Sequence, residues 1–189
     1  MSDETIIIIA SLIWALSEVV GSYIIPGLRR RGTVKARSDR GSRAVIWLSI
    51  FGSIIIASYF GSNEITPLPE SFLYIGIGLM AVGLAFRQWA ILVLGRFFST
   101  TVRIVSDQKL VTKGPYHVVR HPSYTGALLI LLGLGLGSRT LAGTVIFLAL
   151  FGLAYSYRIS VEERALKAEL GQAYTDYARK TKRLIPFVL

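Results

Sequence analysis

Two short stretches of this chain carry the side chains that could do chemistry. The first is residues 114–126, GPYHVVRHPSYTG, which is polar and aromatic, lies between long apolar runs and holds both histidines of the chain. The second is residues 158–163, where Arg158 and Glu162 are four positions apart and so fall on one face of a helix. A guanidinium one turn from a carboxylate suits a site that holds an anionic group beside a cationic one. We therefore interpret the two stretches as facing walls of an active site.

The residue types in these stretches favour binding of a polar small molecule. Pro122 suits the first position of a helix, so His121 and Pro122 predict a helix start whose N–H groups and positive end can receive an anion such as a carboxylate. The rings of Tyr116 and Tyr124 can pack on a flat group while their hydroxyls bind polar partners, and Glu162 can bind an amine or hydroxyls. Two structural explanations stay open: a plain helix cap in the first stretch, and an ordinary surface ion pair in the second.

Composition limits where such a site can lie. Apolar residues make up 52% of the 189 residues and the mean hydropathy is +0.55, too apolar for a soluble domain of this size. The net charge of +10 alone would suggest nucleic acid. The basic residues, however, lie between apolar runs, as they do beside transmembrane segments, so we expect no nucleic-acid partner. The chain has no cysteine, which excludes disulfides, thiolate metal sites and a cysteine nucleophile, and we expect no metal.

The apolar runs predict an all-α, polytopic membrane protein with about five transmembrane helices in a single domain, residues 1–189. The apolar segments are residues 5–25, 44–60, 71–94, 123–136 and 141–157. The first lacks the preceding basic residues of a signal peptide, so we expect a retained anchor that ends at Pro26 and Gly27. It contains Glu18, which is either a functional group in the membrane or the partner of a basic residue such as Arg87.

The end of the chain predicts one long helix. Apolar spacing continues from residue 141 to Leu170, and Gly171 is a good helix C-cap.

The segment at 123–136 is 14 residues long, about 21 Å of helix, which is short of the ~30 Å hydrocarbon core. The glycines of residues 76–83 and 133–137 predict close helix packing rather than a phosphate loop.

The distribution of basic residues predicts the orientation. Residues 29–43, 96–120 and 158–183 hold 7, 5 and 7 lysines and arginines, whereas the loops predicted on the opposite side hold only Arg139. Because cytoplasmic loops are the basic ones, we expect the N-terminus outside and the site and the C-terminus on the cytoplasmic side, beside anionic membrane lipids.

Several spaced motifs follow one another in the second half of the chain. They are LGRFF at 94–98, LVxxGPYxxxRHPxYxG at 110–126, two glutamates at 162–163, GxxYxxY at 171–177 and RLIP at 183–186. This series resembles the isoprenylcysteine carboxyl methyltransferase family, whose wider superfamily includes phospholipid N-methyltransferases and membrane thiol methyltransferases. The resemblance implies a membrane enzyme that uses S-adenosylmethionine without a Rossmann fold. Residues 1–93 would then be a three-helix membrane part and residues 94–189 the cofactor- and substrate-binding part.

Carried over by position, the resemblance also implies roles for individual residues. Arg158 would bind the substrate, and Arg158 and Glu162 would be the catalytic residues. Two positions depart from the family pattern, because a glutamine that contacts the cofactor falls on Thr101 and a histidine falls on Gln108. The cofactor-binding residues would be Gln108, Lys109, Leu110, Val111, Tyr116, His121, Pro122, Ser123, Tyr124 and Glu162.

The sequence therefore predicts an S-adenosylmethionine-dependent membrane methyltransferase that forms a carboxyl methyl ester on a lipophilic, isoprenoid-like substrate entering from the bilayer. A carboxylate is already ionised at neutral pH and needs no general base, so catalysis would depend on positioning and desolvation. Two alternatives remain. The acceptor could be a lipophilic thiol or a lipid amine, or the chain could be a membrane scaffold or transport subunit whose polar stretch only binds a partner.

Overall fold

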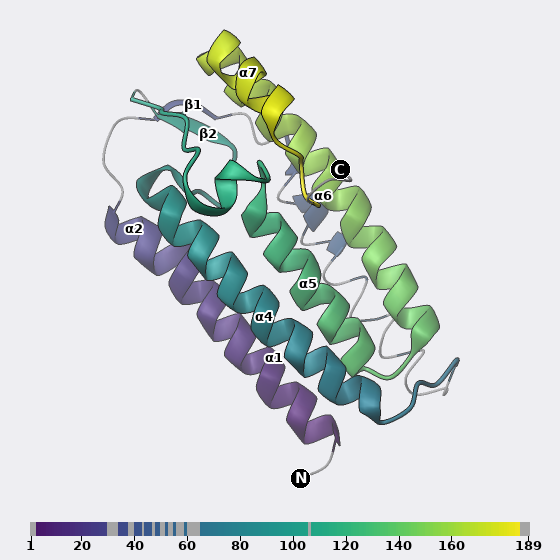
Figure 1. The fold of residues 1–189 in the computed structure, drawn as a ribbon. Helices are drawn as coiled ribbons and strands as arrows, with labels where there is room; N and C mark the ends of the chain where they lie inside the picture. The colour runs from purple at the N-terminus through teal and green to yellow at the C-terminus, as the bar shows by residue number, and fades with distance from the viewer. Residues whose placement is uncertain are drawn as a thin grey trace.

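Long helices form the body of the protein, and the shorter elements gather at one end of it (Figure 1). The structure is a computed structural model and describes residues 3–29, 34–37, 40–42, 44–46, 48–49, 52, 55, 59, 65–105 and 107–185. The long helices are α1 (Asp3–Val19), α4 (Ser71–Leu94), α5 (Pro122–Gly137) and α6 (Leu141–Leu170). The shorter elements include α7 (Gln172–Lys180) and the strands β1 (Val34–Arg37) and β2 (Arg103–Val105).

The helices have the length and composition of a membrane protein. Among the described residues, three helical segments are long and apolar enough to cross a bilayer: Thr5–Ile24, Ser71–Phe97 and Leu141–Leu170. The helix Pro122–Gly137 is apolar but shorter. A mostly helical membrane protein is therefore confirmed. The segment predicted at residues 44–60 lies largely outside the described residues, so the count of about five spans stays a prediction.

The first helix does not end at Pro26, as the sequence had suggested. A π-helical turn, Val20–Ile24, joins α1 to a further helical piece, α2 (Ile25–Arg29). In this wide turn the N–H of Ile25 donates to the carbonyl of Val20. Pro26 then falls in the first turn of α2, where its missing N–H costs little. The helix consequently continues beyond the predicted stop.

Helices α4 and α5 pack through glycines, as predicted. A Cβ on Gly76 would overlap the backbone of Gly133 and lie 2.7 Å from the amide nitrogen of Gly137. One on Gly83 would lie 2.8 Å from the carbonyl oxygen of Gly126. Gly78 has nothing within 4 Å of its Cβ position, so it does not belong to this contact. The small residues let the two backbones approach closely and fix α5 against α4.

The long helix α6 also agrees with its prediction. Its 30 residues make about 45 Å of helix. The Thr140 side chain accepts the N–H of Gly143 at its start, and Gly171, at φ +55°, ends it. That backbone conformation favours glycine. α6 therefore continues past the end of α5 toward α7 (Figure 1).

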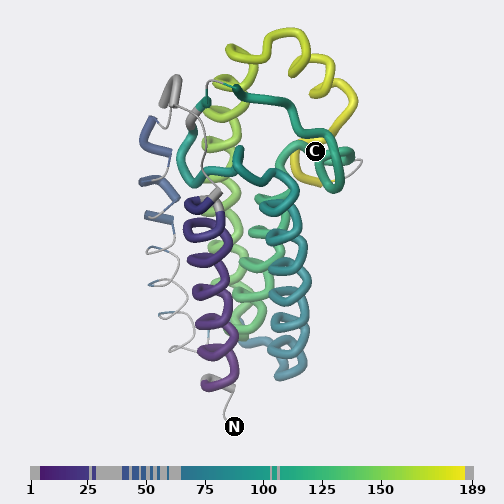
Figure 2. Tube along the Cα trace, turned by 90° about the vertical axis from the view of Figure 1, so that its left-hand side faces the viewer, coloured from purple at the N-terminus to yellow at the C-terminus, as the bar shows by residue number. Residues whose placement is uncertain are grey.

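The loops meet at the two ends of the bundle as the basic-residue pattern had suggested. At one end Leu68 and Arg139 are joined by a backbone hydrogen bond of 2.8 Å, and Pro67 bridges to Thr140. At the other end β1 pairs with β2 in an antiparallel sheet, and α7 lies nearby (Figure 2). The described N-terminal end of α1 is at the end away from α7 (Figure 1). The strand pair is a small departure from the all-α prediction.

Candidate active site

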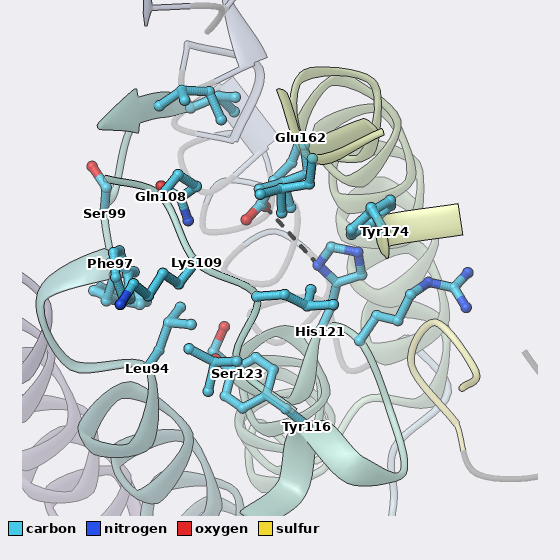
Figure 3. Close-up of a pocket in the computed structure, with 18 of the residues that line it drawn as sticks. Leu94, Phe97, Ser99, Gln108, Lys109, Tyr116, His121, Ser123, Glu162 and Tyr174 are labelled. Atoms are coloured by element: carbon cyan, nitrogen blue, oxygen red, sulfur yellow. Dashed lines mark ion pairs between the residues drawn. The ribbon is translucent and has the colours of Figure 1, made fainter. Parts of the chain in front are cut away.

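A polar pocket lies at the end of the bundle that carries β2 and α7. Its empty space, including the part open to solvent, amounts to about 840 Å³. In Figure 3, Gln108 and Lys109 lie on one side of it, and His121, Glu162 and Tyr174 lie across from them. The predicted cofactor-binding residues that line the pocket are Gln108, Lys109, Leu110, Val111, Tyr116, His121, Ser123, Tyr124 and Glu162.

Pro122 is the one predicted cofactor-binding residue outside this lining. It is buried and opens α5, as its position after His121 had predicted. The carbonyl of His121 accepts the backbone N–H groups of Tyr124 and Thr125 at 3.0 and 3.1 Å. Pro122 therefore acts on the pocket through the helix start that it fixes. Thr101, where the family pattern has a glutamine, also lines the pocket.

The His121 ring lies between two carboxylates of α6. It is 4% exposed, its Nε2 is 3.3 Å from Oε1 of Glu163, and its Nδ1 is 4.0 Å from Oε2 of Glu162. The ring also stacks on Tyr124, with centroids 5.6 Å apart. These contacts fix the orientation of the imidazole at the pocket wall (Figure 3).

Tyr124 connects the two predicted catalytic residues. Its hydroxyl donates to Oε2 of Glu162 at 2.8 Å and accepts from Nε of Arg158 at 3.2 Å. Its ring stacks on Tyr155, with centroids 5.1 Å apart, as well as on His121. Arg158 and Glu162 are thus brought together through a tyrosine hydroxyl.

Arg158 is a buried residue rather than part of a surface ion pair. Its side chain donates to the hydroxyl of Ser42 and to the carbonyl of Thr100, both at 2.9 Å, and the residue is only 2% exposed. The surface ion-pair explanation is therefore wrong. Burying a guanidinium is costly unless its hydrogen bonds are made, so these contacts also fix its place.

A second, more apolar pocket lies next to the polar one and includes Arg158. Its empty space, including the part open to solvent, is about 860 Å³. Tyr124, Phe98 and Ser99 line both pockets. The other lining residues are mostly aromatic or aliphatic, apart from Glu18, Arg87, Thr100 and Arg158. The two pockets therefore share a wall, and Tyr124 is part of it.

The sequence reasoning missed a second ion-pair group behind the polar pocket. Glu163 accepts from Nε of Arg120 at 2.9 Å and from Nη2 of Arg183 at 3.0 Å. The backbone N–H groups of Arg120 and His121 donate to the carbonyls of Lys182 and Arg183 at 2.7 and 3.0 Å. This group ties the end of the chain to the helix start at His121. The adjacent glutamates and the arginine at 183 were visible in the motifs, but nothing in their spacing showed that they pair.

The tyrosines of the site stay protonated at neutral pH and can donate. Burial raises the pKa of Tyr116 well above its usual range, and the negative charge of Glu162 raises it further. Burial raises the pKa of Tyr177 to about 12, and its hydroxyl donates to the carbonyl of Tyr116 at 2.7 Å. Tyr174 also lines the polar pocket, and its buried hydroxyl has no hydrogen-bond partner among the described residues. Such a group is available to a bound ligand.

Comparisons with known proteins show the family to which the chain belongs. Residues 72–173 match the family model described as phospholipid methyltransferase. That is more than half of the chain, and the chain belongs to this family. It is 34% identical over 117 residues, 61% of each chain, to a probable protein-S-isoprenylcysteine O-methyltransferase from Oryza sativa subsp. indica. It is also 31% identical over 150 residues to the cobalt-zinc-cadmium resistance protein CzcN from Cupriavidus metallidurans, covering 76% of this chain and 63% of that one.

A solved structure shows the same relationship. The fold matches that of the eukaryotic intramembrane Ras methyltransferase ICMT with a TM-score of 0.57 and 27% identity, over 82% of this chain and 55% of that one. The resemblance to isoprenylcysteine carboxyl methyltransferases is therefore confirmed. The chain spans about three fifths of the length of the curated isoprenylcysteine methyltransferases that it matches.

Proposed function

We propose that this chain is an S-adenosylmethionine-dependent membrane methyltransferase that esterifies a carboxylate on a lipophilic, isoprenoid-like acceptor. The observation that carries the proposal is the shared wall between the two pockets. Tyr124 stands in that wall, with Glu162 on the polar side and Arg158 on the apolar side. A polar methyl donor and a lipophilic acceptor can therefore meet without either leaving its own pocket.

The polar pocket suits S-adenosylmethionine in its chemistry. Bound there, the cofactor would supply a methyl group on a sulfonium centre. The aromatic and aliphatic lining, including Tyr116 and Leu110, can pack on the adenine, while Glu162 can bind hydroxyls or the amine. The unpartnered hydroxyl of Tyr174 is the further donor that such a polar ligand needs. Gln108 and Lys109 complete the proposed contacts from the opposite side (Figure 3), and Val111 also lines the pocket.

The apolar pocket suits an anionic head on a lipophilic tail. Arg158 presents a buried guanidinium to it, and the paired donors of arginine match a carboxylate. Glu18, the one acidic residue in the described lining, already accepts from Arg87 and from Ser22. It is thus poorly placed to deprotonate an amine or a thiol. A carboxylate needs no such base, which favours it as the acceptor.

The proposed chemistry of the chain is positioning and exclusion of water. Arg158 holds the acceptor oxygen, Tyr124 holds Arg158 and Glu162 in register, and the aromatic lining of the apolar pocket keeps the acceptor dry. Alignment of the reactants and removal of water each lower the barrier to a displacement reaction. We further propose that this end of the bundle faces the cytoplasm, because the basic residues concentrate there.

The deciding experiment compares acceptors. Purified wild-type protein is incubated with labelled S-adenosylmethionine and either a farnesylated cysteine analogue or a lipophilic amine, and calorimetry measures S-adenosylhomocysteine binding. We expect one binding site and transfer to the carboxylate. We expect Arg158→Lys to lower kcat with the donor affinity nearly unchanged, and Arg158→Ala to cost more, on the order of 2–5 kcal/mol. The matched control, Arg139→Lys, lies at the opposite end of the bundle.

Two outcomes would favour an alternative. Transfer only to the amine, undiminished in Arg158→Lys, would replace the carboxylate by a lipid amine and keep the methyltransferase. The family description, phospholipid methyltransferase, is what makes this second acceptor class worth testing. Absence of S-adenosylhomocysteine binding would leave the scaffold or transport alternative.

A further inference from the structure

The buried pair of Glu18 and Arg87 links the walls of the two pockets. Nε of Arg87 donates to Oε2 of Glu18 at 2.7 Å, and Nη2 donates to the other carboxylate oxygen. The third nitrogen, Nη1, turns the other way and donates to the backbone carbonyl of Ser123 at 2.8 Å. Glu18 and Arg87 line the apolar pocket, whereas Ser123 lines the polar one. One guanidinium therefore bonds to both walls.

The surroundings of the pair leave it little freedom. Arg87 is 8% exposed, and its Cβ lies 2.7 Å from the position a Cβ on Gly126 would take. On the α1 side, Ser22 is fully buried in the π-helical turn that follows Glu18, and its hydroxyl donates to the carboxylate at 2.7 Å. Tyr23, in the same turn, lines the apolar pocket. π-helical turns inside α-helices are frequent at functional sites.

The bond to Ser123 reaches the part of α5 on which the site depends. Ser123 follows Pro122 in the first turn of α5 and directly precedes Tyr124. A shift of this turn would move the His121 ring and the Tyr124 hydroxyl together. In a displacement reaction a misplacement of about 1 Å can cost about 100-fold in rate.

We propose that Arg87 and Glu18 are positioning residues that hold the acceptor pocket in register with the donor pocket. This inference rests on the proposed function. Arg87 fixes the start of α5 through the carbonyl of Ser123, while Glu18 fixes the direction of the guanidinium from α1. Neither residue needs to touch the reacting atoms.

The test distinguishes a role of the pair in aligning the two pockets from a role in helix packing alone. In the double variant Glu18→Met with Arg87→Met, an apolar pair replaces the ions; such replacements often keep or raise stability. In the swapped variant Glu18→Arg with Arg87→Glu, an ion pair is restored, but a carboxylate at position 87 cannot donate to the carbonyl of Ser123. The matched control is Gln88→Met, which removes the neighbouring hydrogen bond from Gln88 to the carbonyl of Ser17 and leaves Glu18 and Arg87 unchanged.

We expect both double variants to keep their thermal midpoint in detergent and their affinity for S-adenosylhomocysteine within about threefold, while kcat falls between about 10- and 100-fold. Gln88→Met should keep kcat within about twofold. Recovery of kcat in the swapped variant would mean that the pair is only structural, and an affinity loss as large as the loss in kcat would assign it to the donor pocket alone. Either result overturns the proposal.

Three further outcomes are distinguished. Where the double variants do not fold, Arg87→Lys decides, because one ammonium keeps a charge near Glu18 but cannot reproduce the two-sided guanidinium; an undiminished kcat then overturns the inference. Wild-type protein that transfers no methyl to any acceptor overturns the proposed function, and this inference with it. An active wild type with undiminished variants overturns only the role of Glu18 and Arg87.

Discussion

Replacing Tyr124 by phenylalanine tests the connection between the two pockets with the smallest possible change. The substitution removes one oxygen and keeps the ring, which is held by stacking on His121 and Tyr155. Two hydrogen bonds are lost, one to Glu162 at 2.8 Å and one from Arg158 at 3.2 Å. The two charged groups are then no longer held in register.

The size of the effect follows from these bonds. A hydrogen bond to a charged group contributes about 1.5–3 kcal/mol, and only the part that acts in the transition state appears in kcat. If the transition state loses the free energy of one such hydrogen bond, we expect Tyr124→Phe to lower kcat by about 10- to 150-fold. The affinity for S-adenosylhomocysteine should fall much less, because Glu162 itself remains in place.

The assay is methyl transfer from labelled S-adenosylmethionine to the farnesylated cysteine analogue under saturating conditions, together with calorimetry of S-adenosylhomocysteine binding. Tyr74→Phe is the matched control, since Tyr74 is 57% exposed on α4 and lines neither pocket. A Tyr124→Phe variant with kcat within about twofold of wild type would refute the idea that this hydroxyl aligns donor and acceptor.

Three other predictions concern the cofactor wall, the helix packing and the orientation. His121→Ala should weaken S-adenosylhomocysteine binding, whereas His117→Ala, at an exposed position outside the polar pocket, should leave it nearly unchanged; equal losses in calorimetry would mean that the pocket is misplaced. Gly76→Ala should destabilise by about 1–3 kcal/mol through overpacking against α5, while Gly78→Ala should be neutral or slightly stabilising, and equal thermal midpoints would contradict the packing. Lys180→Cys in this cysteine-free chain should react with an impermeant thiol reagent only after the membrane is opened; labelling of intact cells would reverse the orientation.

The elements that could be predicted from the sequence are those fixed by local signals. The start of α5 follows from Pro122, whose missing N–H suits a first helical position. The end of α6 follows from Gly171, which adopts a positive φ. Apolar residues recur at helical spacing through both the apolar and the charged half of residues 141–170, and this pattern predicted the single 30-residue helix α6. Each of these signals acts within a few residues, so no tertiary structure was needed to interpret it.

The features that were not predicted depend on contacts between distant residues. The strands at 34–37 and 103–105 pair across more than sixty residues and are only four and three residues long. Too short to show a period-2 pattern, they were interpreted as loop. The helical backbone continues past Pro26 because a π-helical turn joins α1 to α2. Arg87 donates to Ser22 in that turn and Gln88 donates to Ser17 before it, and no local sequence signal predicts these contacts.

The candidate site also has a part that could be predicted from the sequence and a part that could not. Its polar wall lies within a few motifs, so nearly all the predicted residues line one pocket. The apolar pocket draws on α1, α4, α5 and α6 together, and its lining follows from packing alone. Glu18 was recognised as unusual in a membrane segment, and its pairing with Arg87, one of the two interpretations left open, is confirmed. The hydrogen bond from Arg87 to the carbonyl of Ser123 could not be predicted, because every residue has a backbone carbonyl and the sequence does not distinguish one from another.

The unequal lengths of the helices explain why a site forms at this end. α5 has 16 residues, about 24 Å of helix, which is less than the ~30 Å hydrocarbon core. Its glycines pack it against α4, so its first turn lies level with Arg87, while α4 continues for seven more residues to Leu94, about 10 Å further. α6 also continues past this level, through Arg158 to Leu170.

The space beyond the first turn of α5 is therefore bounded by α4 and α6, and it is covered by the chain between residues 95 and 121. Because α5 begins below the ends of those neighbours, its first turn lies where apolar side chains give way to polar ones. A lipophilic molecule among the helices and a polar molecule under the covering loop then have that first turn in common. The position of Pro122 sets where α5 begins, and in the proposed reaction it would set the depth at which donor and acceptor meet.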